Sequence, residues 1–421
     1  MTRRRCVVVL DDDPTGTQSA SNVTVLLTWD ADIVEEALAT ADSVYLQTNS
    51  RALDERDAIG LVQAIRGVTA EVADRLDIDV RLVLRGDSTL RGHVVAETRA
   101  IAEVDAVHLF VPAFPAGGRI TRNGVHHLRQ DGRLVPVSQT EYAHDPVFGF
   151  SSSRLTAFIE SYSGARALHV PLDEVRTGRL AGVLREAPAG CFVVPDAEND
   201  EDIGIIAEAV ERVWDSRAVT VRTAAPLAAA LAKVVSRQPL DAEVLSSARS
   251  VLVVCGSHTD GARAQVAALS TRLGPPTVVR TTAALRDPYA EGARAAAEEL
   301  SLSRPGAARF VATERDRCDS HDGLQHGAAV MQALTVAARL LAAEAEVVVT
   351  KGGITSAEVV RQSLGARAAL VCGQVRPGVS VWRVRTDAGQ ECDCVIVPGN
   401  MGDPEILVEA VDWVIGAVRE T

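Results

Sequence analysis

An apolar run near the amino terminus, Cys6–Leu10, limits the possible folds more than any other stretch, because it leads directly into the carboxylates Asp11, Asp12 and Asp13. A short, mostly β-branched run followed by polar residues and glycine predicts a buried parallel strand whose exit loop lies at the carboxyl edge of a sheet. Open α/β folds bind their ligands at that edge. Adjacent carboxylates repel one another, so the loop predicts a general base, a nucleophile or a cation site, with a solvated acidic turn as the alternative.

Composition excludes several classes of protein. The chain has 421 residues, 47% of them hydrophobic, which is enough for two or three domains with cores of their own. Its net charge of −13 argues against a nucleic-acid partner, because phosphates require a basic surface. No apolar stretch is long enough for a membrane span, and the run after Arg3–Arg5 is too short for a signal peptide. With 7 cysteines, several of them in apolar runs, we expect a soluble, reduced, cytoplasmic protein with no membrane partner.

Further strand-like runs in the N-terminal half, at 43–48, 80–84 and 107–111, also lead into polar or glycine-rich loops. The carboxyl ends of parallel strands meet at one edge of a sheet, so these loops should lie together. They carry the arginines Arg51, Arg85, Arg91 and Arg119. Guanidinium groups match the oxygens of carboxylates and phosphates, which indicates an organic acid or a phosphate as ligand. For each arginine alone, a surface salt bridge is the alternative.

The second half contains strand-like runs that turn into helices through glycine and hydroxyl residues, at 251–259, 347–356 and 395–403. Such a turn presents backbone N–H groups and a positive helix end to an anion, although each one also fits an ordinary capped turn. A loop-rich stretch at 124–150 should cover the site of the first half. A polar connection over 236–250 predicts two domains, 1–240 and 241–421. The chain has no Walker A, Rossmann or protein-kinase motif.

The motifs of both halves together resemble the four-carbon acid sugar kinases, a family that includes 3-oxo-tetronate, D-threonate and D-erythronate kinases. The resemblance covers nearly the whole chain. In the first half it rests on D-D-x-T-G at 12–16, D-S-T-L-R-G at 87–92, F-P-x-x-G-R at 114–119 and T-E-x-x-x-D-P at 140–146. In the second half it rests on G-S at 256–257, G-G-x-T-S at 352–356 and G-N-x-G at 399–402.

This resemblance implies an α/β fold of two domains, each built on a largely parallel sheet with flanking helices, and an active site in the cleft between them. It implies ATP- and Mg²⁺-dependent phosphorylation of the terminal (C4) hydroxyl of a tetronate or oxo-tetronate. The partners are then a small sugar acid and ATP, with the two domains closing over both. A homodimer is compatible with the sequence, which does not determine the oligomeric state.

The resemblance also assigns residues to roles. Asp12 and Asp13 become the catalytic pair, one of which orients and deprotonates the hydroxyl. The sugar acid is assigned to Thr15, Arg51, Arg85, Asp87, Ser88, Arg91, Gly118 and Arg119. ATP is assigned to Ser257, Gly352, Gly353, Ile354, Thr355, Gly399, Asn400 and Gly402. Many relatives have an acidic residue at the position of Ile354 and a lysine at that of Arg85, so a metal or ribose contact from the first position is lost here.

Two other functions fit parts of the sequence. Asp11-x-Asp13-x-Thr15 after an apolar strand also matches the D-x-D-x-T motif of haloacid-dehalogenase-like phosphatases, in which Asp11 would be the nucleophile. A non-enzymatic sensor of sugar acids is the second alternative. The three separate glycine turns of the second half argue against it, because a sensor needs only one ligand site.

Overall fold

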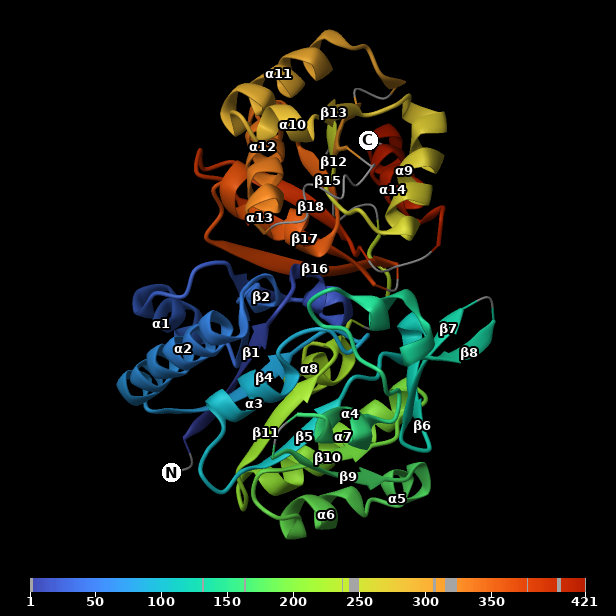
Figure 1. Ribbon diagram of the computed structural model, residues 1–421. Helices are drawn as coiled ribbons and strands as arrows, with labels where there is room; N and C mark the ends of the chain where they lie inside the picture. Colours follow the sequence, from blue (N-terminus) through green and yellow to red (C-terminus); the bar gives the residue numbers. More distant parts are fainter. Residues whose placement is uncertain are drawn as a thin grey trace. The chain divides into compact units, whose positions relative to one another are not determined.

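The computed structural model describes residues 3–130, 132–162, 164–236, 238–241, 250–305, 308–314, 324–376, 378–399 and 403–420. The chain divides into two compact units, Met1–Val235 and Ser236–Thr421 (Figure 1). The domain limits expected from the sequence, 1–240 and 241–421, stay a prediction, because residues 242–249 lie outside the described part.

The N-terminal unit is built on a parallel sheet with the strand order β2-β3-β1-β4-β11-β5-β10-β9. Apolar, mostly β-branched segments form these strands, and the central ones are buried along most of their length. Their bounds are β1 Arg4–Asp11, β2 Val23–Leu26, β3 Ser43–Gln47, β4 Ile78–Arg85, β5 Val107–Val111, β9 Arg166–Val170, β10 Cys191–Pro195 and β11 Val219–Thr223.

Helices lie on both faces of this sheet. Helices α1 to α4 pack on one face, where α3 and α4 share an apolar core with β5 and β10. Helices α5, α6 and α8 pack around α7. Their bounds are α1 Ala31–Thr40, α2 Glu55–Leu76, α3 Val94–Ile101, α4 Leu155–Glu160, α5 Leu172–Arg176, α6 Leu180–Glu186, α7 Asp200–Trp214 and α8 Ala225–Leu231, with short 3-10 turns at η1 Pro14–Ser19, η2 Ser50–Ala52, η3 Pro115–Gly117, η4 Val137–Gln139 and η5 Glu141–His144.

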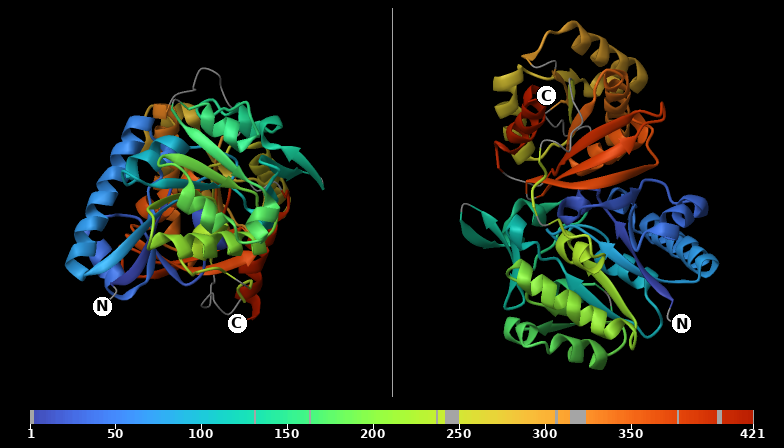
Figure 2. Two further views of the ribbon diagram at one scale, coloured as in Figure 1. Left: turned by 90° about the horizontal axis from the view of Figure 1, so that it is seen from below. Right: turned by 180° about the vertical axis from the view of Figure 1, so that it is seen from behind.

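The stretch 124–150, which the sequence predicts to be loop-rich, contains regular strands. It contains β7 (Val125–Gln130) and β8 (Arg133–Pro136), which form an antiparallel ribbon with β6 (Arg119–Arg122). The β7–β8 end of this ribbon projects from the rest of the N-terminal unit (Figures 1 and 2). A projecting ribbon buries little apolar surface, so its strands lack the apolar pattern that marks the strands of the main sheet.

The C-terminal unit has a sheet with the order β13-β14-β12-β15-β18-β17-β16. The first five strands are parallel, whereas β17 is antiparallel to both β18 and β16. The bounds are β12 Val251–Cys255, β13 Thr277–Val279, β14 Ala308–Thr313, β15 Val347–Lys351, β16 Ala368–Arg376, β17 Val379–Arg385 and β18 Glu391–Val397.

Alternate residues of these strands face different helices. Val251, Val349 and Val395 belong to a core that includes helices α9 and α14, and the other face packs against α11 and α12. The helices are α9 Asp260–Leu273, α10 Thr281–Ala284, α11 Pro288–Ser301, α12 Leu324–Ala342, α13 Gly353–Glu358 and α14 Ile406–Glu420, and a π-helical turn, η9 Val359–Ser363, continues α13. The expected α/β fold with largely parallel sheets is therefore confirmed. No helix in the described ranges is long and apolar enough to cross a membrane.

A buried carboxylate should be critical for the stability of the C-terminal unit. Glu299 at the end of α11 is fully buried and accepts hydrogen bonds from Arg304 (Nη2, 2.7 Å), Thr277 (Oγ1, 2.6 Å) and the backbone of Phe310 (2.8 Å). We expect Glu299→Ala to cost about 3–5 kcal/mol, because it leaves the Arg304 guanidinium buried without its counter-charge. Denaturant unfolding measures this cost.

The control is Glu298→Ala, since the Glu298 side chain is 53% exposed and pairs only at the surface with Arg294. It should change stability by less than about 1 kcal/mol. Equal losses for the two variants would contradict the role of Glu299.

Candidate functional site

Strand register brings an arginine to the acidic loop. Asp11 ends β1 and is paired in register with Arg85, the last residue of β4. Arg85 Nη1 donates to Asp11 Oδ1 (3.0 Å) and to the backbone oxygen of Asp13 (3.1 Å), and it lies 3.6 Å from Asp12 Oδ1. Because Arg85 is only 2% exposed, it stabilises the loop from within the unit.

Asp11 is enclosed. Its side chain has no exposed surface, and a Cβ atom at Gly16 would lie 1.9 Å from Asp11 Oδ2. Only glycine fits at position 16, because any side chain there would collide with the carboxylate of Asp11. Burial raises the pKa of Asp11 to about 7, against the opposing effect of Arg85.

Asp12 and Asp13 point to different arginines. Asp12 Oδ2 accepts a hydrogen bond from Arg222 Nη2 (3.0 Å), and among the described residues its Oδ1 accepts none. Asp13 forms an ion pair with Arg51, whose side chain is 16% exposed. Of the two carboxylates, Asp13 is the more accessible, with 7% of the residue exposed against 2% for Asp12.

A second acidic centre lies next to the first. Asp87 accepts a hydrogen bond from Arg91 Nε (2.8 Å) and lies 3.5 Å from Arg51 Nη1. Burial opposes its ionisation, but Arg91, Arg51 and the hydroxyl of Thr89 outweigh burial and lower the pKa of Asp87. Arg91 also lies over the ring of Tyr142, 5.0 Å from its centroid, in cation–π contact.

The remaining predicted residues of this half lie around that centre. The backbone oxygen of Ser88 lies 2.8 Å from Nε2 of the fully buried His126. Burial lowers the pKa of His126 to about 4, so this imidazole is neutral at pH 7 and holds the loop by hydrogen bonding. Gly118 has a φ of +80°, a conformation that favours glycine. The next residue, Arg119, is 6% exposed and lies close enough to Tyr142 and Asp87 to interact electrostatically with both. Thr15 lies in η1, and only its backbone is described.

Residues that the sequence analysis missed complete the cluster. Arg222 on β11 and Glu97 on α3 are each 1% exposed, and Arg222 Nη1 donates to Glu97 Oε2. Tyr142, within the T-E-x-x-x-D-P motif, is 8% exposed. A charged residue inside the apolar segment Val219–Thr223 was the available signal for Arg222.

The three glycine turns of the C-terminal unit lie close together. Thr259 Oγ1 donates to the backbone oxygen of Gly399 (2.9 Å). A Cβ atom at Gly352, where φ is +110°, would lie 3.1 Å from Ser257 Cβ, and a Cβ at Gly399 would lie 3.1 Å from Ser257 Oγ. Glycine therefore permits both the backbone conformation and the close approach. Lys351, which the sequence motifs did not single out, is fully buried and donates to the backbone oxygen of Pro398.

The other predicted residues of this unit differ in accessibility. Thr355 is buried, and its hydroxyl oxygen would lie 2.2 Å from a Cβ at Gly256. Gly353 begins α13, and Ile354 beside it is 45% exposed. Asn400 and Gly402 lie outside the described residues.

In the described ranges, no group of three or more His, Cys, Asp or Glu side chains is arranged to hold a metal ion. The acidic residues of the N-terminal unit are instead paired with guanidinium groups.

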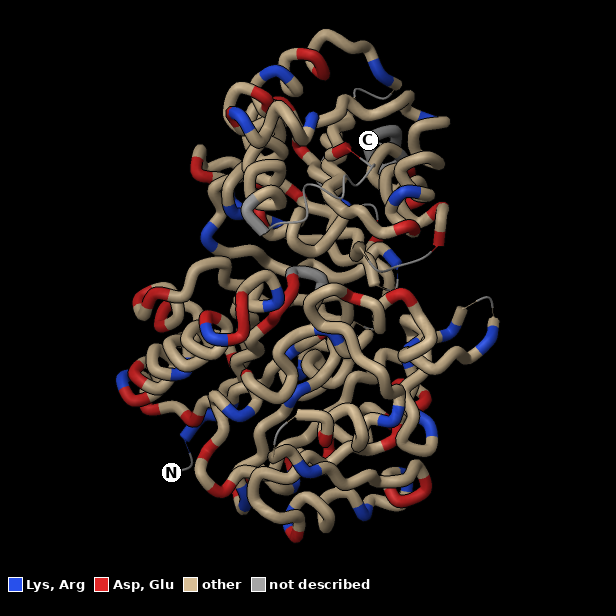
Figure 3. The backbone as a smooth tube through the Cα atoms, in the orientation of Figure 1, with Lys and Arg blue, Asp and Glu red and all other residues tan. Residues whose placement is uncertain are grey.

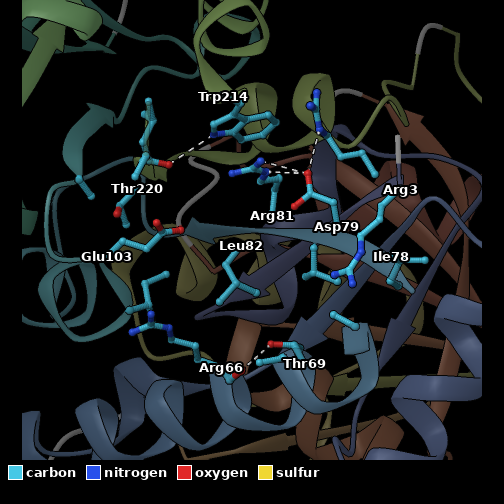
Figure 4. Close-up of a pocket in the computed structure, with 18 of the residues that line it drawn as sticks. Arg3, Arg66, Thr69, Ile78, Asp79, Arg81, Leu82, Glu103, Trp214 and Thr220 are labelled. Atoms are coloured by element: carbon cyan, nitrogen blue, oxygen red, sulfur yellow. Dashed lines mark hydrogen bonds and ion pairs between the residues drawn. The ribbon is translucent and has the colours of Figure 1, made fainter. Parts of the chain in front are cut away.

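A cavity of about 600 Å³ lies elsewhere in the N-terminal unit, at the amino-terminal ends of β1, β4 and β11 (Figure 4). Arginines and acidic residues on its wall pair with one another: Arg81 Nη2 lies 3.0 Å and Arg5 Nε 3.5 Å from Asp79 Oδ2. The acidic loop follows the other end of β1. Over α2 and the outer helices of each unit, acidic and basic residues are interspersed (Figure 3).

Fold and site thus define a two-unit α/β protein, with acidic and guanidinium groups clustered in the first unit and glycine turns in the second. Residues 7–231 match the model of a sugar-binding N-terminal domain, and residues 252–407 match that of a nucleotide-binding C-terminal domain. The chain belongs to the four-carbon acid sugar kinase family.

Individual proteins agree with this assignment. A D-threonate kinase of Bordetella bronchiseptica is 29% identical over 432 residues, which cover 98% of this chain and 97% of that protein. A D-threonate kinase of Cupriavidus necator is 30% identical over 288 residues, 63% of this chain and 64% of that protein. A crystal structure of a Salmonella typhimurium protein, 19% identical, has a TM-score of 0.67 and covers 96% of this chain and 98% of its own, which shows the shared fold.

The raised pKa of Asp11 leads to a prediction about pH. A carboxyl group whose pKa rises from 3.8 to about 7 on folding contributes stability that is present below about pH 4 and is lost as the pH rises through about 7. Asp11→Asn removes this titration. The stability of the wild type relative to Asp11→Asn should therefore fall with rising pH, by at most about 1.4 kcal/mol per pH unit. Denaturant unfolding over a pH series measures the difference, and a constant difference across that window would contradict the raised pKa.

Proposed function

We propose that the chain is an ATP-dependent kinase that phosphorylates the terminal, C4 hydroxyl of a four-carbon acid sugar, such as a tetronate or an oxo-tetronate. The observation that carries the proposal is the cluster of carboxylates and guanidinium groups at one sheet edge of the sugar-binding domain. The names of the full-length relatives support the same reaction and class of substrate.

In this proposal the partly exposed arginines bind the sugar acid. Arg51 and Arg91 are 16% and 20% exposed, so their guanidinium groups can meet a carboxylate while Asp87 keeps them in place. Arg119, Ser88, Gly118 and Thr15 complete the binding site. Arg85, which is 2% exposed and bonded to the acidic loop, holds that loop rather than the ligand.

The acidic loop supplies the base. Asp13 is the more accessible carboxylate and faces Arg51, so we assign it the acceptor hydroxyl, which it orients and whose proton it accepts. Asp12 completes the pair and is held by Arg222.

The glycine turns of the C-terminal unit bind ATP. Gly352 and Gly399 leave room beside Ser257 for the backbone to approach phosphate oxygens, and Gly353 begins α13, where N–H groups are available. Thr355, Ile354, Asn400 and Gly402 are assigned to the same site. Mg²⁺ bound to the ATP phosphates would neutralise part of their charge. Closure of the domains over both substrates and a homodimer stay predictions, as does a cytoplasmic location.

The two alternatives are not favoured. A D-x-D-x-T phosphatase needs Asp11 to attack phosphorus, but Asp11 has no exposed surface and lies beneath Gly16. A sensor without catalytic activity would not need the contiguous glycine turns of the nucleotide-binding domain.

The function is tested by coupled ATP consumption over a panel of four- to six-carbon aldonic and keto acids. We expect turnover with a four-carbon acid.

Asp13→Asn should lower kcat by about 100-fold or more with a modest change in KM, as the loss of a base does, and Asp11→Asn should lower kcat much less. ATP-independent hydrolysis of p-nitrophenyl phosphate, together with the opposite ranking of the two variants, would overturn the kinase proposal.

A second prediction concerns ATP alone. Gly352→Ala places a methyl group 3.1 Å from Ser257 Cβ at a φ of +110°, so it should weaken ATP binding strongly in calorimetry while the sugar acid still binds. Gly389→Ala is the matched control, because Gly389 also has a positive φ, +80°, but nothing lies within 4 Å of the added methyl group. Unchanged ATP affinity in a folded Gly352→Ala variant would mean that the nucleotide binds elsewhere.

A further inference from the structure

We propose that Arg222 is a positioning residue for phosphoryl transfer: it holds the carboxylate of Asp12 in place and is itself held by Glu97. The inference rests on the proposed kinase function and adds two residues that the family motifs quoted above do not contain. All three side chains belong to the N-terminal unit.

The three groups form a continuous chain of charges. Arg222 Nη2 donates to Asp12 Oδ2 at 3.0 Å, and Arg222 Nη1 donates to Glu97 Oε2. Glu97, Arg222 and Asp12 are 1%, 1% and 2% exposed, so water does not compete for these contacts. They come from α3, β11 and the loop after β1, and the fold brings them together across 125 and 210 residues of sequence.

Two glycines make room for the guanidinium. A Cβ atom at Gly86 would lie 2.4 Å from Arg222 Nη2, and one at Gly92 would lie 3.2 Å from both Arg222 Nη2 and Asp12 Oδ2. These glycines flank the D-S-T-L-R segment assigned to the sugar acid. The segment assigned to the sugar acid therefore begins and ends beside the Asp12–Arg222 contact.

Arg222 and Arg85 bond to different groups of the acidic loop. Arg85 Nη1 bonds to Asp11 and to the backbone of Asp13, but it lies 3.6 Å from Asp12. The hydrogen bond to Asp12 comes instead from Arg222. A fork that bonds Asp12 through one nitrogen and Glu97 through another fixes the direction of the carboxylate, which a single ammonium group cannot do.

The experiment measures kcat and both KM values for the full chain with a sugar acid that the wild type phosphorylates. Arg222→Met should lower kcat by about 100-fold, because a misplacement of about 1 Å within a catalytic site can cost that much, with both KM values within about twofold. Arg222→Lys should restore part of kcat, and Glu97→Gln should cause an intermediate loss.

A double variant tests whether Glu97 acts through Arg222 or independently of it. If Glu97 acts through Arg222, then Glu97→Gln should lower kcat less in the Arg222→Lys background than in the wild type. Should Arg222→Met fail to fold, Arg222→Lys, Glu97→Gln and their double variant still decide the question.

Asp202→Asn serves as the control for a purely structural loss. Asp202 is 1% exposed, pairs with Arg176 (2.8 Å) and accepts a hydrogen bond from the backbone of the α7 N-cap residue Asn199, so its change should lower stability and leave kcat as it is. A folded Arg222→Lys variant with wild-type kcat, or additive effects of the Arg222 and Glu97 variants, would overturn the positioning role of Arg222 and Glu97. The proposed kinase function would not be affected. A wild type that phosphorylates no sugar acid would overturn the proposed kinase function, and the positioning role of Arg222 with it.

Discussion

The N-terminal unit depends on the compensation of buried carboxylates. Asp11 and Asp12 are 0% and 2% exposed, and an ionised carboxylate removed from water is costly unless it is paired and hydrogen-bonded. Arg85 on β4 and Arg222 on β11 supply the counter-charges. The strand order β1-β4-β11 is therefore an electrostatic requirement as well as a packing arrangement.

As a result, the arginines of the site differ in their accessibility to a ligand. Arg85 and Arg222, at 2% and 1% exposed, are enclosed with the carboxylates that they neutralise, whereas Arg51 and Arg91 are partly accessible. The inner arginines preserve the shape of the loop, and the outer ones can meet a ligand. The same packing explains the glycine at position 86, just before the D-S-T-L-R segment, since a side chain there would collide with the guanidinium of Arg222.

The C-terminal unit forms its candidate site differently. Its turns are in contact through glycine and hydroxyl groups, with Ser257 packed beside Gly352 and Gly399 and with Thr259 bonded to the backbone of Gly399. Backbone N–H groups in such turns bind anions directly. The contrast agrees with the division into a sugar-binding and a nucleotide-binding domain.

By itself, the sequence determined the apolar strands, the fold class, the family and the arginines at the strand exits. These features can be predicted because they depend on short segments: an apolar run such as Cys191–Pro195 favours a strand whichever strand it pairs with. Only the tertiary structure revealed Arg222, Glu97 and the enclosure of Asp11. The roles of Arg222 and Glu97 depend on β11 lying between β4 and β5, although it follows both by more than 100 residues. A local pattern cannot indicate which strand will be a neighbour, and the counter-charge of a buried carboxylate belongs to that neighbour.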